Sequence, residues 1–391
     1  MDASPDSAAD RDALAFRARV AVSVAFLLLG AGPGLWAVHI PLVQERLGIN
    51  PAILGLGLLV MAAGAVIAMP IMGWAVGHVG SRIPTAAGMI LYMATIPLPI
   101  LAGSVPLFFV ALFFFGLLMG GLDVVGNVQA AEVETLRRKP TMSSFHAFYS
   151  IGGLGGALIG ALLIANGWGD GTGAMTVCIV LLALAAVAAG NLLPSEKPID
   201  GAPRFALPSR AVLGLGILAF LCFAIEGAVT DWSALFLTSA KSATPEHAAF
   251  GYAAYALAMA GFRLFGDPVV VRLGPKLVTV GGSLLCVLGL AISLASPWPL
   301  VSALGFGLVG LGAANIVPVL FSAGARTPGV ASGVGVSAVA TLGYSGFLVF
   351  PPILGFAADA FGLSAAIGIV LLMSGLMAWL GARQNLPRAD K

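Results

Sequence analysis

Twelve apolar segments, each about as long as a membrane-spanning helix, constrain this chain more than any other feature. A spanning helix needs roughly 20 mostly apolar residues. The segments lie at 18–43, 52–76, 83–103, 106–131, 143–166, 174–193, 210–237, 248–271, 277–296, 299–322, 330–357 and 363–383. Only 9% of the 391 residues are charged, against roughly 25% in an average soluble domain. The sequence therefore predicts an all-α, polytopic membrane protein with twelve transmembrane helices.

The longest polar interruption, 194–209, falls at the midpoint of the chain and divides the twelve segments into two sets of six. We therefore expect a six-helix bundle at 1–193, a cytoplasmic linker at 194–209 and a second six-helix bundle at 210–391. The halves repeat weakly: a glycine-rich stretch ends at Gly80 and another at Gly274, an offset of 194 residues. Asn127 and Asn315 form a further pair, at an offset of 188. Two pseudo-symmetric bundles are typical of parallel-repeat transporters, whose site lies at the repeat interface near mid-membrane.

The basic residues predict the orientation of the chain. With a cytoplasmic N-terminus, sixteen of the 19 Lys and Arg residues fall on the cytoplasmic side, two on the outer side and one, Arg263, inside a segment. Cytoplasmic loops carry the excess of Lys and Arg. We therefore expect both termini to be cytoplasmic.

A carboxylate lies inside the fourth segment. Asp123 follows the apolar run that starts at Leu107, and Asn127 lies four residues later, on the same helix face. Ionisable groups at this depth are costly and usually face a bundle interior or a water-filled path. Gly116 and Gly120 lie on or near that face and allow either close helix contact or a cavity. We expect Asp123 to carry a coupling proton; the alternative is that both side chains only hold helices together.

Two short connections contain a recognisable pattern of glycine, acid and base. The stretch from Gly266 to Lys276, GDPVVVRLGPK, is predicted to be a tight turn in which an acid and bases can pair. It resembles the loop signature of the major facilitator superfamily, G-x-x-x-D-x-x-G-R-[KR]. The first copy departs from this signature, with Gly77 in the place of the acid and Ser81 in the place of an arginine. The gate residues that the resemblance implies are Arg82, Arg263, Asp267 and Arg272.

Longer strings narrow this resemblance. The stretches GLDVVGNVQAAEVE (121–134), MSSFHAFYSIG (142–152), EGAVTDWSA (226–234), GFRLFGD (261–267) and TLGYSGFL (341–348) are similar to the bacterial YbjJ-like inner-membrane transporters. That group is similar to the fucose:proton symporter branch, in which an acid on the fourth helix and an Asn four residues later serve proton coupling and sugar binding. The branch also uses an Asp on the first helix, where this chain has Ala37.

A substitute for that missing acid can lie in the seventh segment. At the offset of 194, Ala37 corresponds to Asp231, and Glu226 lies five residues before it. Five residues on a helix rotate two side chains roughly 140° apart, so we do not expect both to face one site. Asp231 can instead cap the outer helix end. The candidate proton-coupling residues are Asp123, Glu226 and Asp231.

The remaining polar and aromatic side chains inside segments suit a small polar solute. The candidate substrate-binding residues are Trp36, His39, Asn127, His146, Tyr149, Asn315 and Tyr344. Glu132 and Glu134, close to Arg137, are expected to form a solvated ion cluster at the membrane edge.

These patterns favour a secondary transporter over an enzyme. We expect alternating access with proton-coupled symport of a small polar solute, such as a sugar, across a bacterial inner membrane, by a monomer. Export of amphipathic compounds is a rival, as is a non-transporting membrane receptor. The sequence contains no pattern typical of a metal site, a nucleotide loop, a cofactor or nucleic-acid binding, so the expected partners are the solute, protons and the lipid bilayer.

Overall fold

The computed structural model describes residues 8–49, 51–194, 210–243 and 245–386, and every regular element in them is a helix. The predicted linker at 194–209 lies outside the described residues except for Pro194. Contacts divide the chain into two compact units. Unit 1 contains α1–α7 and Gly329–Ser337. Unit 2 contains α8–α13 and the chain from Ala338 on, which includes α15.

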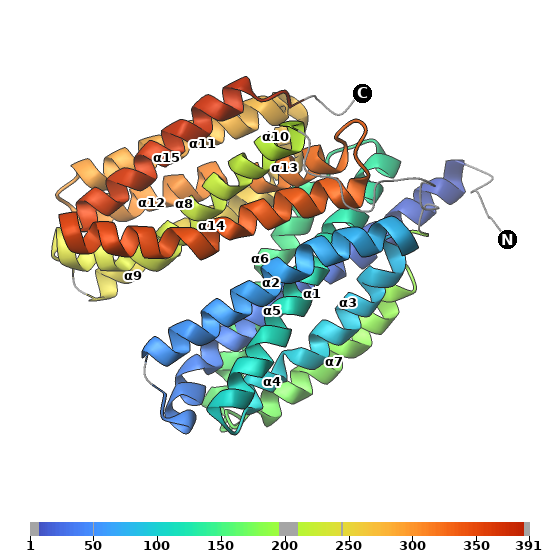
Figure 1. Cartoon of the computed structure of the whole chain (residues 1–391), viewed down its shortest axis with the longest axis horizontal. Coiled ribbons are helices and arrows are strands. Elements are labelled where there is room, and N and C mark those ends of the chain that lie inside the picture. Colours follow the sequence, from blue (N-terminus) through green and yellow to red (C-terminus); the bar gives the residue numbers. More distant parts are fainter. Residues whose placement is uncertain (1–7, 50, 195–209, 244, 387–391) are drawn as a thin grey trace. The chain divides into compact units, whose positions relative to one another are not determined.

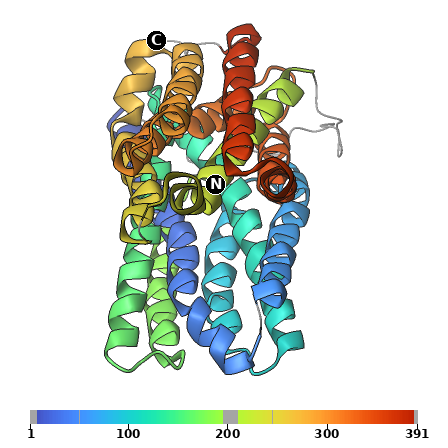
Figure 2. The same ribbon diagram turned by 90° about the vertical axis from the view of Figure 1, so that its left-hand side faces the viewer.

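In unit 1, each predicted segment is helical (Figure 1). The bounds are α1 Ala8–Leu47, α2 Pro51–Val79, α3 Arg82–Thr95, α4 Pro97–Leu101, α5 Val105–Arg137, α6 Met142–Ala165 and α7 Thr172–Ala189. The third segment is interrupted between α3 and α4, where Pro97 and Pro99 follow Ile96. Proline lacks the backbone N–H that continues an α-helix. Figure 2 shows the helices of unit 1, blue to green, running alongside one another.

In unit 2, the six predicted segments are also helical. The bounds are α8 Arg210–Lys241, α9 Pro245–Leu264, α10 Gly266–Leu273, α11 Pro275–Ala295, α12 Pro299–Ala313, α13 Ile316–Ala325, α14 Ser332–Phe361 and α15 Leu363–Arg383. Eleven helices of the described chain are long and apolar enough to span a membrane, and a twelfth span forms if α9 and α10, bent by 66°, count together. The prediction of an all-α chain with twelve spans is confirmed.

Helix packing repeats between the units. In unit 1, α2 packs on α5, α3 on α5 and α7, and α1 on α6 and α7; in unit 2, α9 packs on α12, α11 on α12 and α15, and α8 on α15. Close glycine contacts repeat in register. A side chain at Gly116 would collide with the backbone of Met61, and one at Gly310 would collide with the backbone of Tyr255. Both members of this pair are offset by 194 residues, as are the positive-φ residues Gly80 and Gly274.

This register corrects one pairing expected from the sequence. At an offset of 194, Asn315 corresponds to Gly121, and Asn127 corresponds to Phe321. Asn127 and Asn315 are therefore not equivalent positions of the repeat, because the contact at Gly310 fixes the alignment only five residues before Asn315.

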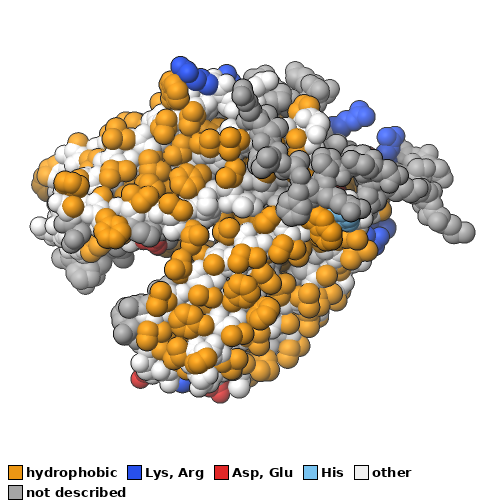
Figure 3. Space-filling view, viewed as in Figure 1, with side chains coloured by type: hydrophobic (Ala, Val, Ile, Leu, Met, Phe, Trp, Pro, Cys, Tyr) orange, Lys and Arg blue, Asp and Glu red, His pale blue; other side chains and the backbone are white. Residues whose placement is uncertain are grey.

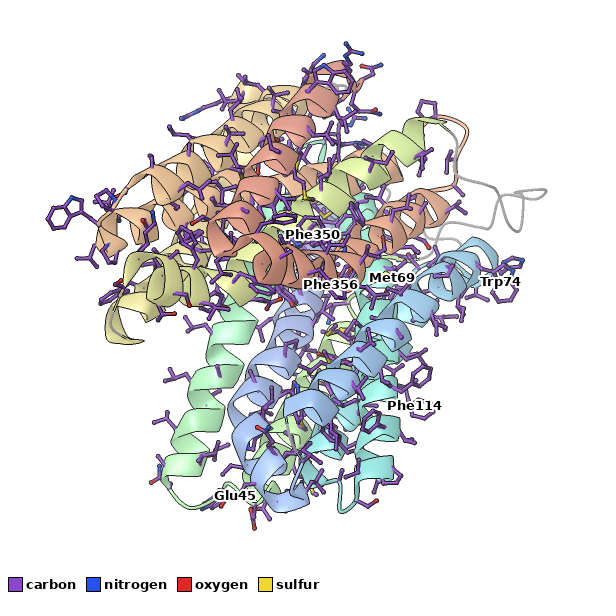
Figure 4. The ribbon with its side chains drawn as sticks, turned by 60° about the vertical axis from the view of Figure 1, so that its left-hand side comes forward. Glu45, Met69, Trp74, Phe114, Phe350 and Phe356 are labelled. Atoms are coloured by element: carbon purple, nitrogen blue, oxygen red, sulfur yellow. The ribbon has the colours of Figure 1, made fainter. Side chains whose placement is uncertain are left out.

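On the face shown in Figure 3, apolar side chains cover much of the described surface of each unit, as a lipid environment requires. Phe114 on α5 and Trp74 on α2 point away from unit 1 and are 47% and 43% exposed (Figure 4). Met69, on the same helix as Trp74, is buried. Several polar side chains are buried inside the units, among them Asp123, Asn127 and Glu226.

Candidate functional site

In unit 1, a buried chain of three polar side chains joins two helices. Asn127 Nδ2 on α5 donates to Asp123 Oδ1 at 3.2 Å and to the Asp123 carbonyl oxygen at 2.8 Å. His146 Nε2 on α6 contacts Asn127 Oδ1 at 3.2 Å. The amide oxygen can only accept, so the imidazole nitrogen donates in this contact. The predicted shared face of Asp123 and Asn127 is confirmed, and His146 lies with them.

This three-residue chain lies deep in the unit. Asp123, Asn127 and His146 are 4%, 0% and 7% exposed. The ring of Phe26 on α1 meets the His146 ring edge-on, with centroids 5.1 Å apart. Ionisable groups at this depth are costly and usually face a bundle interior or a water-filled path.

Glycines on α5 and α6 pack these two helices closely on α2 and α1, respectively. Gly116 and Gly120 pack directly on the α2 backbone at Met61 and Ala65. Gly152 and Gly156 on α6 pack in the same way on Leu27 and Ala31 of α1. Of the two roles expected for Gly116 and Gly120, close helix contact is the one that the structure supports.

The other candidate residues of unit 1 lie on α1 and α6. Trp36 is buried, with its ring 6.0 Å from that of Phe108. His39 is also buried, and its Nδ1 donates to the Leu35 carbonyl oxygen at 2.8 Å. Neither His39 Nε2 nor Trp36 Nε1 has a hydrogen-bond partner among the described residues. Tyr149 is half-buried on α6.

Unit 2 has a different buried cluster, built around a cation. Arg263 on α9 is 7% exposed, and its Nε donates to the Ala314 carbonyl oxygen at 3.0 Å. Its Nη2 lies 4.0 Å from Glu226 Oε2 on α8. Glu226 is buried, and its Oε1 accepts a long contact of 3.5 Å from Cys222 Sγ.

Pro318 explains why Arg263 bonds to a backbone carbonyl. In a continuous helix, the Ala314 oxygen would accept from the backbone N–H four residues later. That residue is Pro318, which has no N–H. The segment breaks here between α12 and α13, and the guanidinium supplies the missing donor.

Three further candidates of unit 2 occupy separate environments. Asn315, at the break, is 1% exposed, and neither side-chain amide atom has a hydrogen-bond partner among the described residues. Asp231 is exposed while Glu226 is buried, which agrees with the expectation that the two carboxylates diverge. Tyr344 on α14 is half-buried and packs on Phe223, with ring centroids 4.9 Å apart.

Comparison with known proteins identifies the family. Residues 22–243 match the Major Facilitator Superfamily. The chain belongs to the Major Facilitator Superfamily. It is 37% identical over 357 residues to an uncharacterized MFS-type transporter of Yersinia pestis, covering 91% of this chain and 92% of that one. It is therefore a multi-pass membrane transporter.

Solved structures show the same fold at low sequence identity. FucP in its outward conformation aligns with a TM-score of 0.75 and 15% identity, over 94% of this chain and 98% of that chain. FucP is the fucose:proton symporter of E. coli. The proton:xylose symporter XylE aligns with a TM-score of 0.74 and 15% identity, over 97% of each chain. The superfamily fold is thus confirmed.

Within this superfamily fold, the predicted gate residues have the following places. The stretch GDPVVVRL is not a turn but the helix α10, with Asp267 in its first turn and Arg272, exposed, in its last. An acid at the start and a base at the end of a helix each stabilise its dipole. Arg82 Nη2 donates to the Gly190 carbonyl oxygen at 3.3 Å, at the end of α7.

The acids near Arg137 are not a solvated cluster, contrary to expectation. Glu134 is 3% exposed, and its Oε2 accepts from the backbone N–H groups of Thr141 and Met142 at 2.8 and 3.0 Å. It therefore caps the start of α6. Glu132 Oε2 accepts a hydrogen bond from Ser81 Oγ at 2.7 Å. Ser81, which stands where the loop signature has an arginine, therefore contacts an acid of α5.

Sequence reasoning missed the contact of Arg263 with Glu226 and with Ala314. A signal was present: Glu226 is an acid inside the seventh segment, Arg263 is a base inside the eighth, and a proline follows Ala314 by four residues. Buried opposite charges on neighbouring helices of a membrane protein usually pair.

Proposed function

We propose that this transporter is a symporter that couples protons to the uptake of a small polar solute, such as a sugar, and that Asp123 carries the proton. The observation that supports the proposal most is the buried chain Asp123–Asn127–His146, which puts one carboxylate next to an amide and an imidazole inside a spanning helix. We further propose a YbjJ-like transporter in the bacterial inner membrane with cytoplasmic termini.

The chemistry of the three groups fits that role. Protonation neutralises Asp123 and removes the free-energy cost of burying a charge. The transporter can then change between its outward-facing and inward-facing states. Asn127 Nδ2 already donates to Asp123 Oδ1, and it can transfer that hydrogen bond to a hydroxyl of the solute. Release of the proton on the inner side restores the acceptor and resets the cycle.

His146 is proposed to position the amide. Its Nε2 donates to Asn127 Oδ1, which fixes the orientation of the amide so that Nδ2 faces the carboxylate. Trp36, His39, Tyr149, Asn315 and Tyr344 are proposed solute contacts, and Glu226 and Asp231 are proposed as alternative proton sites. Arg82, Arg263, Asp267 and Arg272 are proposed gate residues.

Two solved structures with the same fold support the proposal of proton-coupled sugar transport. FucP and XylE are proton symporters of fucose and xylose. Export of amphipathic compounds is the second candidate, favoured by Ala37, which stands where the fucose branch has an acid, and by the apolar interior.

One experiment separates the two functions. Purified protein in proteoliposomes is given an inward or an outward proton gradient, and the uptake of a sugar panel is compared with that of cationic amphipathic dyes. Symport predicts sugar accumulation only when protons flow in the same direction. Dye movement against the proton flow, with no sugar accumulation, would replace symport by export.

A further inference from the structure

The structure has a surface pocket in unit 2 whose lining contains none of the proposed transport residues. The pocket has a volume of about 460 Å³ and lies where α10 ends, α11 begins and α15 ends. Its lining includes Leu273, Lys276, Leu277, Val280, Ala382 and Leu386. It contains one cation, several apolar side chains and no carboxylate.

The cations at this pocket form no ion pair within the described chain. Lys276 lines the pocket, and Arg272 precedes the lining residue Leu273; both are exposed, and neither forms an ion pair with another described residue. Arg383, next to Ala382, stacks on the Trp379 ring at 4.0 Å from its centroid. Three basic residues therefore lie around one apolar pocket at the ends of spanning helices. Such a site is complementary to a ligand that has an anionic group and an apolar tail.

The apolar part continues along the outside of α11. Leu277, Leu284 and Leu288 are 53%, 54% and 50% exposed, and their spacing of seven and four residues puts them on one helix face. From Leu277 to Leu288, the helix rises roughly 16 Å, about half of the ~30 Å hydrocarbon core and so about one leaflet. An acyl chain on this face would reach mid-membrane.

In unit 1, hydrogen bonds link the helix ends at the equivalent place. At the repeat offset of 194, Lys276 corresponds to Arg82, and the end of α15 corresponds to the end of α7. Arg82 spans that gap and donates to Gly190, and Gln129 Nε2 donates to the Leu193 carbonyl oxygen at 3.3 Å. In unit 2, the side chain of Lys276 remains at the surface, and the gap is the pocket.

From this contrast we propose that the pocket binds the headgroup of an anionic phospholipid, with Lys276 and Arg272 holding the phosphate and one acyl chain lying on Leu277, Leu284 and Leu288. The basic-residue bias assigns this end of α11 to the cytoplasmic leaflet. The proposal is independent of the solute and of proton coupling.

The test uses the full-length protein, delipidated in detergent. Native mass spectrometry and thermal shift report binding of phosphatidylglycerol, of phosphatidylethanolamine with the same acyl chains, and of soluble glycerol phosphate. Lys276→Gln with Arg272→Gln removes two charges at the pocket. Lys139→Gln with Arg138→Gln removes two exposed charges from unit 1 and is the matched control.

We expect the wild type and the control to bind phosphatidylglycerol in preference to phosphatidylethanolamine. The pocket variant should bind it about 25-fold more weakly, because each surface cation contributes roughly a factor of five to the attraction of anionic lipid. Ala382→Trp, which fills the pocket and keeps the charges, should also weaken binding.

Three results would overturn the proposal. One is equal loss in the pocket variant and the control, which would mean a diffuse charge effect. Another is equal binding of the two lipids. The third is competition by glycerol phosphate at the same concentration as the lipid, which would make the pocket a site for soluble anions.

Discussion

The two units share a helix arrangement but hold their buried polar groups in opposite ways. In unit 1, α5 is continuous from Val105 to Arg137, and Asp123, Asn127 and His146 bond to one another through side chains. In unit 2, the equivalent segment is broken after Ala313, and Arg263 bonds to the Ala314 backbone oxygen. A carboxylate bonded to an amide can gain and lose a proton, whereas a guanidinium stays charged in proteins.

We infer from this difference that the buried polar groups of the two units have different roles. Side-chain contacts can rearrange when a solute arrives without disturbing the helix that carries them. A cation that satisfies a backbone carbonyl at a proline break is tied to the integrity of the helix pair, because its removal leaves both a buried carbonyl and Glu226 without that contact. We therefore expect changes in unit 1 to affect coupling and changes in unit 2 to affect stability.

The largest expected effect is on accumulation. Asp123→Asn should abolish the concentration of solute against a gradient, because no proton can be released from an amide. The wild type, moving one proton per solute, can accumulate about tenfold per unit of pH gradient. Exchange of labelled for unlabelled solute at equal concentrations should survive. Asp170→Asn, the same chemical change in an exposed loop of unit 1, is the control. Normal accumulation by Asp123→Asn would make Asp123 structural and Glu226 the next candidate.

The next effect is on stability and belongs to unit 2. Arg263→Gln should lower the free energy of unfolding by about 3–5 kcal/mol, the usual cost of breaking a buried charge pair. Adding Glu226→Gln should recover part of that loss, because the double variant leaves no unpaired charge. Chemical unfolding in detergent measures both. Strictly additive losses would mean that the 4.0 Å approach of the two groups carries no coupling.

Much of the fold could be predicted because a bilayer imposes simple rules on a sequence. All twelve apolar segments form helices, and the face shared by Asp123 and Asn127 follows from helical geometry alone. The contact of His146 with Asn127 could not be predicted in the same way, since it depends on how two separate helices, α5 and α6, are placed in the folded unit.

The errors have identifiable causes. The shared residue type suggests that Asn315 is the repeat counterpart of Asn127. The helix contacts at Gly116 and Gly310 instead set the register of the repeat, and in that register the two residues are not equivalent. The three basic residues after Glu134 suggest a solvated acid, but Glu134 caps α6 through a chain reversal that local sequence does not specify. The stretch after Phe265 contains Gly, Asp and Pro, which are common in turns, yet these residues start the helix α10.

A smaller effect is expected on solute binding. Asn127→Ala should weaken binding by about 1–3 kcal/mol, because a hydrogen-bonding amide is removed from a buried site. Asn315→Ala provides the comparison with unit 2. Its amide has no partner among the described residues, so its loss should not lower stability and should weaken binding only if the solute reaches it. Equilibrium binding and unfolding of both variants measure these effects. Unchanged binding by Asn127→Ala would remove the amide from the solute site.

The smallest effect concerns the break in unit 2. Pro318→Ala restores a backbone N–H that can bond to the Ala314 oxygen. In the Pro318→Ala background, Arg263→Gln should lower the free energy of unfolding by about 1 kcal/mol less than it does in the wild type. That difference is the value of one hydrogen bond. A double-variant cycle of unfolding free energies gives this difference. An equal cost in both backgrounds would show that Arg263 acts through Glu226 alone.

The most direct test of the central claim, that Asp123 carries the coupling proton, is proton movement itself. Proteoliposomes in weak buffer with an external pH dye receive a pulse of solute and no imposed gradient. We predict that solute entry through the wild type makes the outside more alkaline, and that entry through Asp123→Asn leaves the external pH unchanged. Solute-driven alkalinisation of equal size in both proteins would contradict the account.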